Sequence, residues 1–279
     1  PTFESPTYRQ KIHGFDLAFF PQPKDKKRSQ DKRGNQIIVA TWKPTPPEIT
    51  ARVSFKAQNQ TRLEQFKTGT RFPPGKVPPD ISPYLSPTKQ VQSDDPRIRK
   101  LAKELTQDVT TQFDAVQRIL TWIVDNLRYV TPPAKYDALY GLEARKGNCQ
   151  NFSHLSAALM RAVSIPVRIV NGVTLNKPFN VSRKGGVLTF KMGQGRHSWI
   201  EVWFRDLGWV PFDPQQTELF VSNRYIRIEI GIDNNETIND GLLRWSQISG
   251  SKGKPRLQES INADFDTDQV KLSGSRQQY

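Results

Sequence analysis

Cys149 is the only cysteine among the 279 residues, and it follows Gly147 and Asn148 where a helical pattern begins. A lone thiol can form neither an internal disulfide nor a multi-cysteine zinc site, so its chemistry is expected to be nucleophilic. At a helix N-terminus, the unpaired backbone N–H groups and the helix dipole favour the thiolate. Asn148 suits the N-cap position, and Gly147 would let a substrate approach the backbone closely.

A base for this thiol must come from His13, His154 or His197, the three histidines of the chain. His154 lies on the same predicted helix as Cys149 and points about 140° away from it, because an α-helix has about 3.6 residues per turn. His13 belongs to a separate β-rich segment. His197, in a strand-like run, is therefore the candidate general base, with a hydrogen-bonded sheet histidine as the alternative.

Asp213 is the candidate acid, because a carboxylate that accepts from the second ring nitrogen fixes the imidazole tautomer. The alternative is a turn residue before Pro214, since Asp-Pro often opens a turn. A loop over residues 205–208 would place Asp213 opposite Ile200, offset from His197 by about three residues or on the order of 10 Å. Twist, a bulge or a longer loop must close that distance.

The periodicity of apolar residues predicts the elements that position these side chains. Helices are expected from about Pro96, over residues 114–127, and from Cys149 to about residue 163. Residues 129–145 are expected to form a loop with short helical turns. Strands are expected over residues 37–42, 49–55, 167–173, 197–204, 209–212 and 225–232. A β-rich segment, then helices, then an antiparallel sheet predicts an α+β fold.

The composition divides the chain into three parts. Residues 1–90 are β-rich and end in a linker with six prolines between positions 73 and 87, which is typical of extended backbone. Residues 91–245 carry the helices and the predicted sheet. Residues 246–279 are poor in hydrophobic residues and are expected to be an extended or poorly ordered tail.

The net charge of +14 predicts attraction to polyanions such as nucleic acid, acidic cell-wall polymers or anionic lipid. No zinc finger, RNA-binding aromatic motif or basic amphipathic helix accompanies the charge, so a specific nucleic-acid partner is not expected. No run of 18 apolar residues exists, so no membrane span is expected.

Three acidic residues near the C-terminus are spaced like the ligands of a calcium loop. Asp264, Asp266 and Asp268 occupy alternate positions, but Gln269 stands where the loop needs glycine and Ser275 where it needs the closing glutamate. We therefore expect no metal site there and no cofactor for the chain.

Three motifs in this order resemble those of the transglutaminase-like superfamily, a papain-like group with a cysteine nucleophile. They are Gly-Asn-Cys-Gln-Asn-Phe at 147–152 leading to Ser-Ile-Pro-Val-Arg at 164–168, His-Ser-Trp-Ile-Glu-Val at 197–202, and Gly-Trp-Val-Pro-Phe-Asp-Pro at 208–214. The resemblance covers about residues 94–243. It implies a papain-like core in which helices pack on an antiparallel sheet. The first ninety residues resemble the β-sandwich domain that precedes this core in many bacterial members.

By this resemblance Cys149 would be the nucleophile, His197 the general base and acid, and Asp213 the orienting acid. The chain departs from the family pattern at residues that surround the catalytic set. Two amides follow the cysteine where the family usually has Arg-Asp, and serines replace the usual glycine before Ile-Pro and the usual alanine after the histidine; these positions are Gln150, Asn151, Ser164 and Ser198. Substrate preference is therefore left open.

The candidates for substrate binding are Trp199, Tyr140 and Asn148. Trp199 shares a strand face with His197, although packing is the commoner role of a strand tryptophan. The backbone N–H of Cys149 is the natural donor to an oxyanion, and Tyr129 or Tyr140 is the candidate for a second donor.

The resemblance implies a two-domain bacterial hydrolase that attacks protein or peptide amides through a thioester. Resolution of the thioester by water would make the chain a cysteine protease or amidase, which is the expectation. Resolution by a lysine amine would make it a protein-glutamine transglutaminase. A third alternative is a non-catalytic scaffold that binds a polyanion or a protein partner. Because the chain starts at Pro1 without a methionine, a trimmed form in the periplasm or outside the cell is expected, with the cytoplasm as the alternative.

Overall fold

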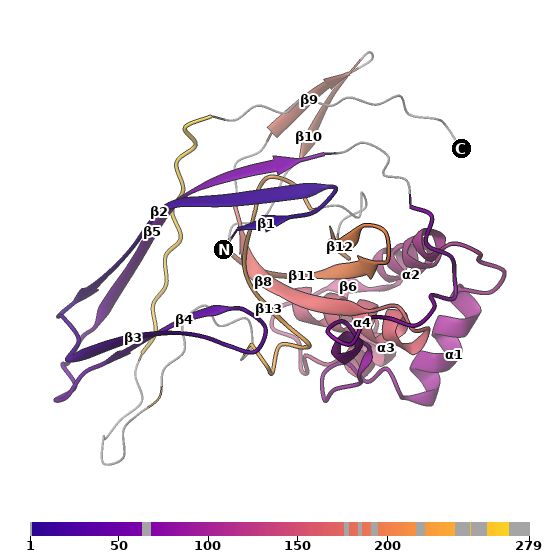
Figure 1. Cartoon of the computed structure of the whole chain (residues 1–279), viewed down its shortest axis with the longest axis horizontal. Coiled ribbons are helices and arrows are strands. Elements are labelled where there is room, and N and C mark those ends of the chain that lie inside the picture. Colours follow the sequence, from indigo (N-terminus) through magenta and orange to yellow (C-terminus); the bar gives the residue numbers. More distant parts are fainter. Residues whose placement is uncertain are drawn as a thin grey trace.

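The computed structural model describes residues 2–62, 68–175, 179–183, 186–190, 195–215, 221–237, 246 and 256–267, with the backbone alone for 179–183 and 186–190. Figure 1 shows a lobe of helices packed on a sheet, and β-ribbons from the N-terminal part that reach away from it. Among the described residues, no helix is long and apolar enough to cross a membrane.

The central sheet has four antiparallel strands in the order β12-β11-β8-β13. Their bounds are β8 Val167–Thr174, β11 Gly195–Phe204, β12 Gly208–Phe212 and β13 Tyr225–Gly231. A separate hairpin of β9 (Phe179–Arg183) and β10 (Gly186–Phe190) lies between β8 and β11 in the chain.

Four α-helices belong to this lobe: α1 Pro96–Leu105, α2 Gln112–Asn126, α3 Ala138–Ala144 and α4 Cys149–Ala162. The N-cap side chains of Asp95 and Thr111 accept backbone N–H groups, which fixes the starts of α1 and α2. The main core joins α1, α2 and α4 to the sheet through aliphatic and aromatic side chains, for example Ile119, Leu155, Leu159, Ile200 and Phe204. Burial of this apolar surface is the main stabilisation of the lobe.

The direction of α4 brings Cys149 to a particular end of the sheet. Residues 163–166 connect α4 directly to β8, and α4 packs on β8 and β11, so helix and strand run antiparallel. In this connection Ser164 has φ 66°, a backbone conformation that glycine adopts more readily. The N-terminus of α4 therefore lies at the end of the sheet where β8 ends and where β11 and β13 begin.

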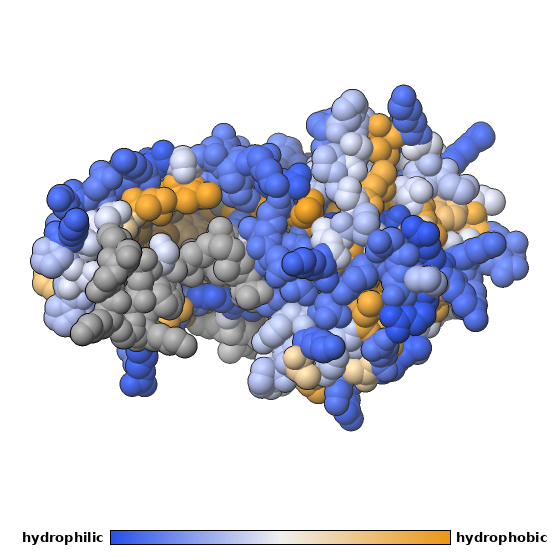
Figure 2. Space-filling view, turned by 90° about the horizontal axis from the view of Figure 1, so that it is seen from below, coloured by the Kyte–Doolittle hydropathy of each residue, from blue (hydrophilic) through white to orange (hydrophobic). Residues whose placement is uncertain are grey.

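The N-terminal part forms a three-stranded sheet and a hairpin. The sheet has the order β1-β2-β5, with β1 Phe3–Glu4, β2 Tyr8–Phe20 and β5 Thr50–Thr61. The hairpin pairs β3 (Asp25–Gln30) with β4 (Gln36–Thr41). Apolar side chains remain exposed on these ribbons, including Phe20, Val39 and Val53, and Figure 2 shows apolar surface on this part of the molecule.

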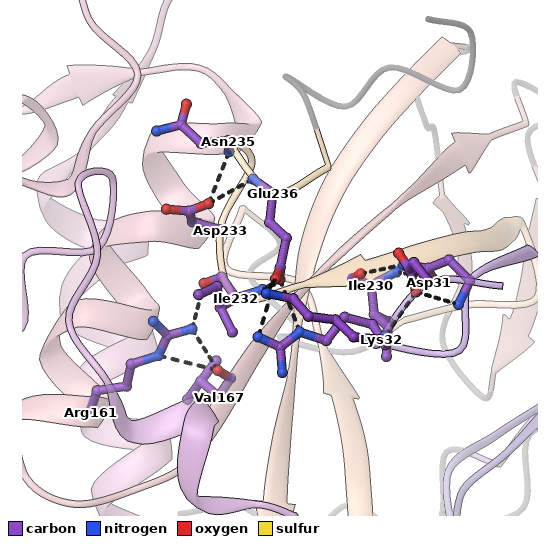
Figure 3. Close-up of polar contacts among 11 residues, drawn as sticks. Asp31, Lys32, Arg161, Val167, Ile230, Ile232, Asp233, Asn235 and Glu236 are labelled. Carbon is purple, nitrogen blue, oxygen red and sulfur yellow. Dashed lines mark hydrogen bonds and ion pairs between the residues drawn. The ribbon is translucent and has the colours of Figure 1, made fainter. Parts of the chain in front are cut away.

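The turn between β3 and β4 docks on the segment that follows β13 (Figure 3). Glu236 accepts from Lys32 at 2.9 Å and from the Arg33 Nε at 3.0 Å. The Asn35 amide exchanges two hydrogen bonds of 2.8 Å with the backbone of Ile230, so it acts as a short extension of the sheet. On the core side, Arg161 donates to the carbonyl oxygen of Ile232 at 2.6 Å.

The α+β class and the β-rich N-terminal part are confirmed. In the described N-terminal strands, the buried side chains of Tyr8 and Gln10 contact β13 rather than an opposing sheet. The sandwich arrangement and the domain boundaries of residues 1–90, 91–245 and 246–279 stay predictions.

Strand β2 differs from the sequence-based expectation. The 13-residue strand β2 was not predicted, because its apolar residues do not alternate regularly with polar ones. Residues 129–145, expected to form a loop with short helical turns, contain the seven-residue helix α3. Of the tail, residues 256–267 are irregular in structure, and most of the remaining positions lie outside the described residues.

Candidate active site

The start of α4 is fixed by a capping box built from two asparagines. The Asn148 side chain accepts from the Gln150 N–H at 3.1 Å, and the Asn151 side chain accepts from the Asn148 N–H at 3.1 Å. A Cβ atom at Gly147 would lie 2.3 Å from the Cβ of Asn151. The glycine is therefore required by the cap itself. The expectation that it also lets a substrate approach the backbone stays a prediction. A substrate contact of Asn148 stays a prediction.

His197 and Asp213 meet through the register of β11 and β12. Ile200 pairs with Phe212, so Asp213 follows opposite Trp199, two residues from His197 and on the same side of the strand. The turn has three residues, 205–207, and not four as expected. This corrects the predicted pairing of Asp213 with Ile200, because a slip of one residue moves a side chain to the other face of a sheet. The His197 Nε2 lies 2.8 Å from the Asp213 Oδ2.

Asp213 is completely buried and accepts three hydrogen bonds. Besides His197, the Tyr225 hydroxyl donates to Oδ2 and the Gln215 N–H donates to Oδ1 at 2.9 Å. Burial alone would raise the pKa of Asp213, but the charge of His197 and these hydrogen bonds lower it. The contact with Gln215 is an Asx-turn, so Asp213 has both roles that the sequence left open.

His197 connects this carboxylate to the thiol. Because Nε2 is bonded to Asp213, Nδ1 is the nitrogen that remains for the hydrogen bond with the Cys149 side chain. Burial by itself lowers the pKa of His197, but the charge of Asp213 and the hydrogen bonds to Asp213 and Cys149 raise it to about 10. The imidazole is therefore a cation at neutral pH and faces a thiol that is itself buried.

The rings of Trp199 and Tyr225 pack against the imidazole of His197. Trp199 is 1% exposed, and its ring stacks on His197 with 5.9 Å between centroids and 26° between planes. Tyr225 meets the edges of both rings, at 5.6 Å from His197 and 5.2 Å from Trp199. A Cβ atom at Gly172 would clash with the carbonyl oxygen of Ile226 in β13 and lie 2.6 Å from the Trp199 ring, so both the strand pairing and the stack need glycine there. Substrate contact by Trp199 stays a prediction.

Tyr225 is the site residue that sequence reasoning missed. The alternation of residues 225–232 predicted its strand, but no sequence signal links a tyrosine in β13 to Asp213, because only the packing of the sheet brings them together.

The two tyrosines proposed as second oxyanion donors are placed differently. Tyr129 forms part of β6 (Arg128–Tyr129), which pairs in parallel with β7 (Lys146–Gly147), so it lies opposite Gly147 and close to the thiol. It is 53% exposed, and burial of its hydroxyl and then the charge of Cys149 raise its pKa. Tyr140 lies in the first turn of α3, where its N–H donates to Asp137. Tyr129 is therefore the better candidate.

His154 uses both ring nitrogens in the core. Nε2 accepts from the Asn234 N–H at 3.2 Å, so Nδ1 carries the proton and donates to the Tyr136 carbonyl at 2.6 Å. Complete burial lowers its pKa and keeps it neutral. Neither nitrogen is free to serve the thiol, in agreement with the helix geometry.

Comparisons with known proteins find matches for the part of the chain that carries Cys149, His197 and Asp213. Residues 99–214 match the transglutaminase-like superfamily. The protein YebA of Bacillus subtilis is 32% identical over 126 residues, which cover 42% of this chain and 17% of YebA. The protein ML0607 of Mycobacterium leprae is 30% identical over 122 residues, which cover 43% of this chain and 40% of ML0607. The chain thus spans less than half the length of these relatives.

A crystal structure from Cytophaga hutchinsonii, of a protein described as a "Putative Cysteine Protease", has the same fold. Its TM-score is 0.59 at 22% sequence identity, and the match covers 85% of this chain and 75% of that chain.

Proposed function

We propose that this chain, in which residues 99–214 form a transglutaminase-like domain, breaks amide bonds of peptides or proteins through a thioester on Cys149. Water is the proposed acceptor of the acyl group. The observation that carries the proposal is the position of His197 between the Asp213 carboxylate and the Cys149 thiol. This is the arrangement of nucleophile, base and orienting acid that acyl transfer needs.

In the first step the Cys149 sulfur attacks the amide carbonyl carbon as a thiolate. The C–N bond then breaks, and the imidazolium of His197 gives its proton to the leaving amine, which leaves a thioester and a neutral imidazole. In the second step His197 takes a proton from water, and the hydroxide attacks the thioester. The carboxylic acid departs, and the thiolate–imidazolium pair is restored.

The negative charge that develops on the carbonyl oxygen needs donors beside the thiol. The Cys149 N–H at the N-terminus of α4 is one, because the first N–H groups of a helix have no partner within the helix. The Tyr129 hydroxyl is the proposed second donor, since its strand lies against Gly147. Asp213, held by Tyr225, keeps the imidazole oriented throughout.

The first test is the rate of Cys149 alkylation by iodoacetamide from about pH 5 to 9 in the wild type and in His197→Ala. An ordinary thiol titrates near pKa ~8.5, so rapid labelling below pH 7 that is lost in the variant supports a thiolate–imidazolium pair. An ordinary thiol profile in both proteins, with labelling after unfolding as the control for access, contradicts the proposal.

The second test separates water from an amine as acceptor. Peptide amides are screened with and without a primary amine, and both the free acid and the amine conjugate are measured, with Cys149→Ala as the blank. Free acid as the main product supports hydrolysis. Conjugate as the main product supports transglutamination, and neither product from any substrate favours a binding scaffold.

A further inference from the structure

An irregular segment near the C-terminus, residues 256–267, contacts two arginines that are sequence neighbours of residues in the candidate site. The Glu259 carboxylate accepts from the Arg196 Nε at 2.8 Å, and its second oxygen pairs with a terminal nitrogen of the same guanidinium. The Arg224 guanidinium lies 4.6 Å from the centre of the Phe265 ring. Figure 1 shows the segment as a yellow trace beside the N-terminal strands.

These two arginines flank the residues that orient the imidazole. Arg196 directly precedes His197 in β11, and Arg224 directly precedes Tyr225, whose hydroxyl binds Asp213. Arg196 pairs with Val173 and Val173 pairs with Ile226, so the three residues form one row across the sheet. This row lies at the end of the sheet where α4 begins with Cys149. The segment therefore crosses the molecule at the same end as the thiol.

The two contacts are of a kind that discriminates between ligands. A carboxylate that accepts from two nitrogens of one guanidinium is oriented by the geometry of the two hydrogen bonds and is also attracted by the charge. The Arg196 and Glu259 side chains are 24% and 32% exposed, so water screens this pair only in part. Arg224 is 1% exposed and combines its charge with the face of an aromatic ring. Together, Arg196 and Arg224 bind an acidic residue and an aromatic residue six positions later in an extended chain.

A third contact of the segment provides a contrast within the same molecule. Asp266 lies 3.2 Å from the Lys56 ammonium, but the two side chains are 77% and 79% exposed. An ion pair this open to water contributes little, because solvent and salt screen it. The segment has three acidic residues and one basic residue, and its three described contacts are all with cationic side chains, those of Arg196, Arg224 and Lys56.

We propose that Arg196 and Arg224 form a binding surface for an extended acidic peptide, and that residues 256–267 occupy it in the manner of such a ligand. The segment then restricts access to Cys149 until it is displaced. The extension to substrates, in which acidic peptides with a later aromatic residue would be preferred, rests on the proposed function. The binding surface itself does not.

The test compares Glu259→Arg with Asp266→Arg in the full chain, since both substitutions make the same change of charge in the same segment. The readout is the rate of Cys149 alkylation by iodoacetamide at neutral pH, which needs no substrate. Glu259→Arg is expected to raise the rate about tenfold, because losing a charge-assisted bidentate pair is worth about one factor of ten. Asp266→Arg is expected to change it less than about twofold. The double variant Arg196→Glu with Glu259→Arg should restore the slow rate.

A second measurement tests the ligand class directly. A fluorescent synthetic peptide with the sequence of residues 256–267 is titrated into Glu259→Arg and followed by anisotropy, and a peptide with glutamine for the glutamate and alanine for the phenylalanine is the control. Preferential binding of the native peptide, weakened by salt, supports the surface.

Equal labelling rates in Glu259→Arg and Asp266→Arg overturn the proposal, as does equal binding of the two peptides. Circular dichroism and the milder Glu259→Gln variant show whether a changed rate comes from misfolding. If labelling responds to Glu259 while the wild type and His197→Ala both show an ordinary thiol profile, the proposed function fails and this inference stands.

Discussion

Two clusters of buried charge lie on the same strand, β11, and only one of them has a group that can react. In the first, the fully buried Glu201 carboxylate accepts from the Arg168 Nε at 2.5 Å and from the Arg227 Nε at 2.7 Å. Burial alone would raise the pKa of Glu201, but the two guanidinium groups lower it. Both partners are permanently charged, so no proton moves near neutral pH.

The second cluster begins four residues earlier on the strand, at His197. Its carboxylate, Asp213, binds one titratable cation and one tyrosine hydroxyl in place of two arginines. The imidazole therefore keeps a second nitrogen, which faces Cys149.

The difference lies in the partner of the carboxylate. A buried carboxylate surrounded by guanidinium groups is a structural ion cluster, in spite of its perturbed pKa. A buried carboxylate that holds a histidine against a nucleophile is a candidate for catalysis. Shifted pKa values alone would not separate the two clusters. The presence of a group that can give up a proton to a substrate does separate them.

Asp213→Asn should give the largest effect and should act on catalysis. The amide cannot stabilise the imidazolium by charge, and we expect kcat to fall about 10⁴-fold, as is typical for loss of the acid from a triad. The His197 imidazolium donates the proton to the leaving amine and is lost as the pH rises through its pKa of about 10. Without Asp213 that loss should begin at lower pH, which the alkaline limb of kcat on the best substrate of the screen would report.

The same pKa shift predicts how stability depends on pH. The pKa of His197 is raised on folding, so its contribution is fully present below the unfolded value of about 6.5 and is lost as the pH rises through about 10. The free energy of unfolding should therefore fall between about pH 7 and 10 in the wild type and fall less in Asp213→Asn. Equal slopes would contradict the charge pairing.

Glu201→Ala should give the next largest effect and should act on folding. Two buried arginines would lose their common carboxylate, which costs about 3–5 kcal/mol of unfolding free energy when one partner of a buried ion cluster is removed. Urea denaturation measures the loss. Alkylation of Cys149 in the folded fraction should keep its pH profile, and a changed profile would mean that the two clusters are coupled.

Tyr225→Phe removes a hydroxyl from Asp213 and leaves the ring that packs on Trp199. We expect kcat to fall about tenfold, because one hydrogen bond to a charged group is worth about 1.5–3 kcal/mol and only part of it is specific to the transition state. The pKa of Asp213 should rise toward its ordinary value, so the acid limb of the pH profile should move to higher pH.

Tyr8→Phe is the matched control for Tyr225→Phe. The Tyr8 hydroxyl donates to the backbone carbonyl oxygen of Tyr225 at 2.5 Å, whereas the Tyr225 hydroxyl donates to the Asp213 carboxylate. The Tyr8→Phe variant should have a lower free energy of unfolding, and both limbs of the pH profile of kcat should stay in place. A shift of the acid limb in Tyr8→Phe would show that the N-terminal strands tune the site.

Glu236→Gln should have the smallest effect, because the amide keeps the shape of the side chain and an oxygen that can still accept from Arg33. We expect a loss of about 1 kcal/mol of unfolding free energy from the lost charge. The loss should shrink at about 1 M salt, since screening then acts within about 3 Å. A loss as large as that of Glu201→Ala would mean that docking of the β3–β4 turn controls the stability of the whole chain.

The sequence by itself determined the elements that carry the site. The cap at Asn148, the apolar stripes and the alternation of residues 225–232 gave the start of α4 and most strands of the sheet, because these signals depend on neighbours along the chain. The chain has a single thiol, and His154 points away from it on the same predicted helix. These two facts favoured His197 as the candidate base.

Only the tertiary structure decided how these side chains meet. The three-residue turn before β12 sets the register that brings Asp213 to His197, and a single additional residue would turn the carboxylate to the other face. The hydroxyl of Tyr225, the strand of Tyr129 against Gly147 and the two arginines around Glu201 depend on contacts between distant parts of the chain. Local periodicity carries no record of such contacts, because they follow from the packing of strands and not from the spacing of residues.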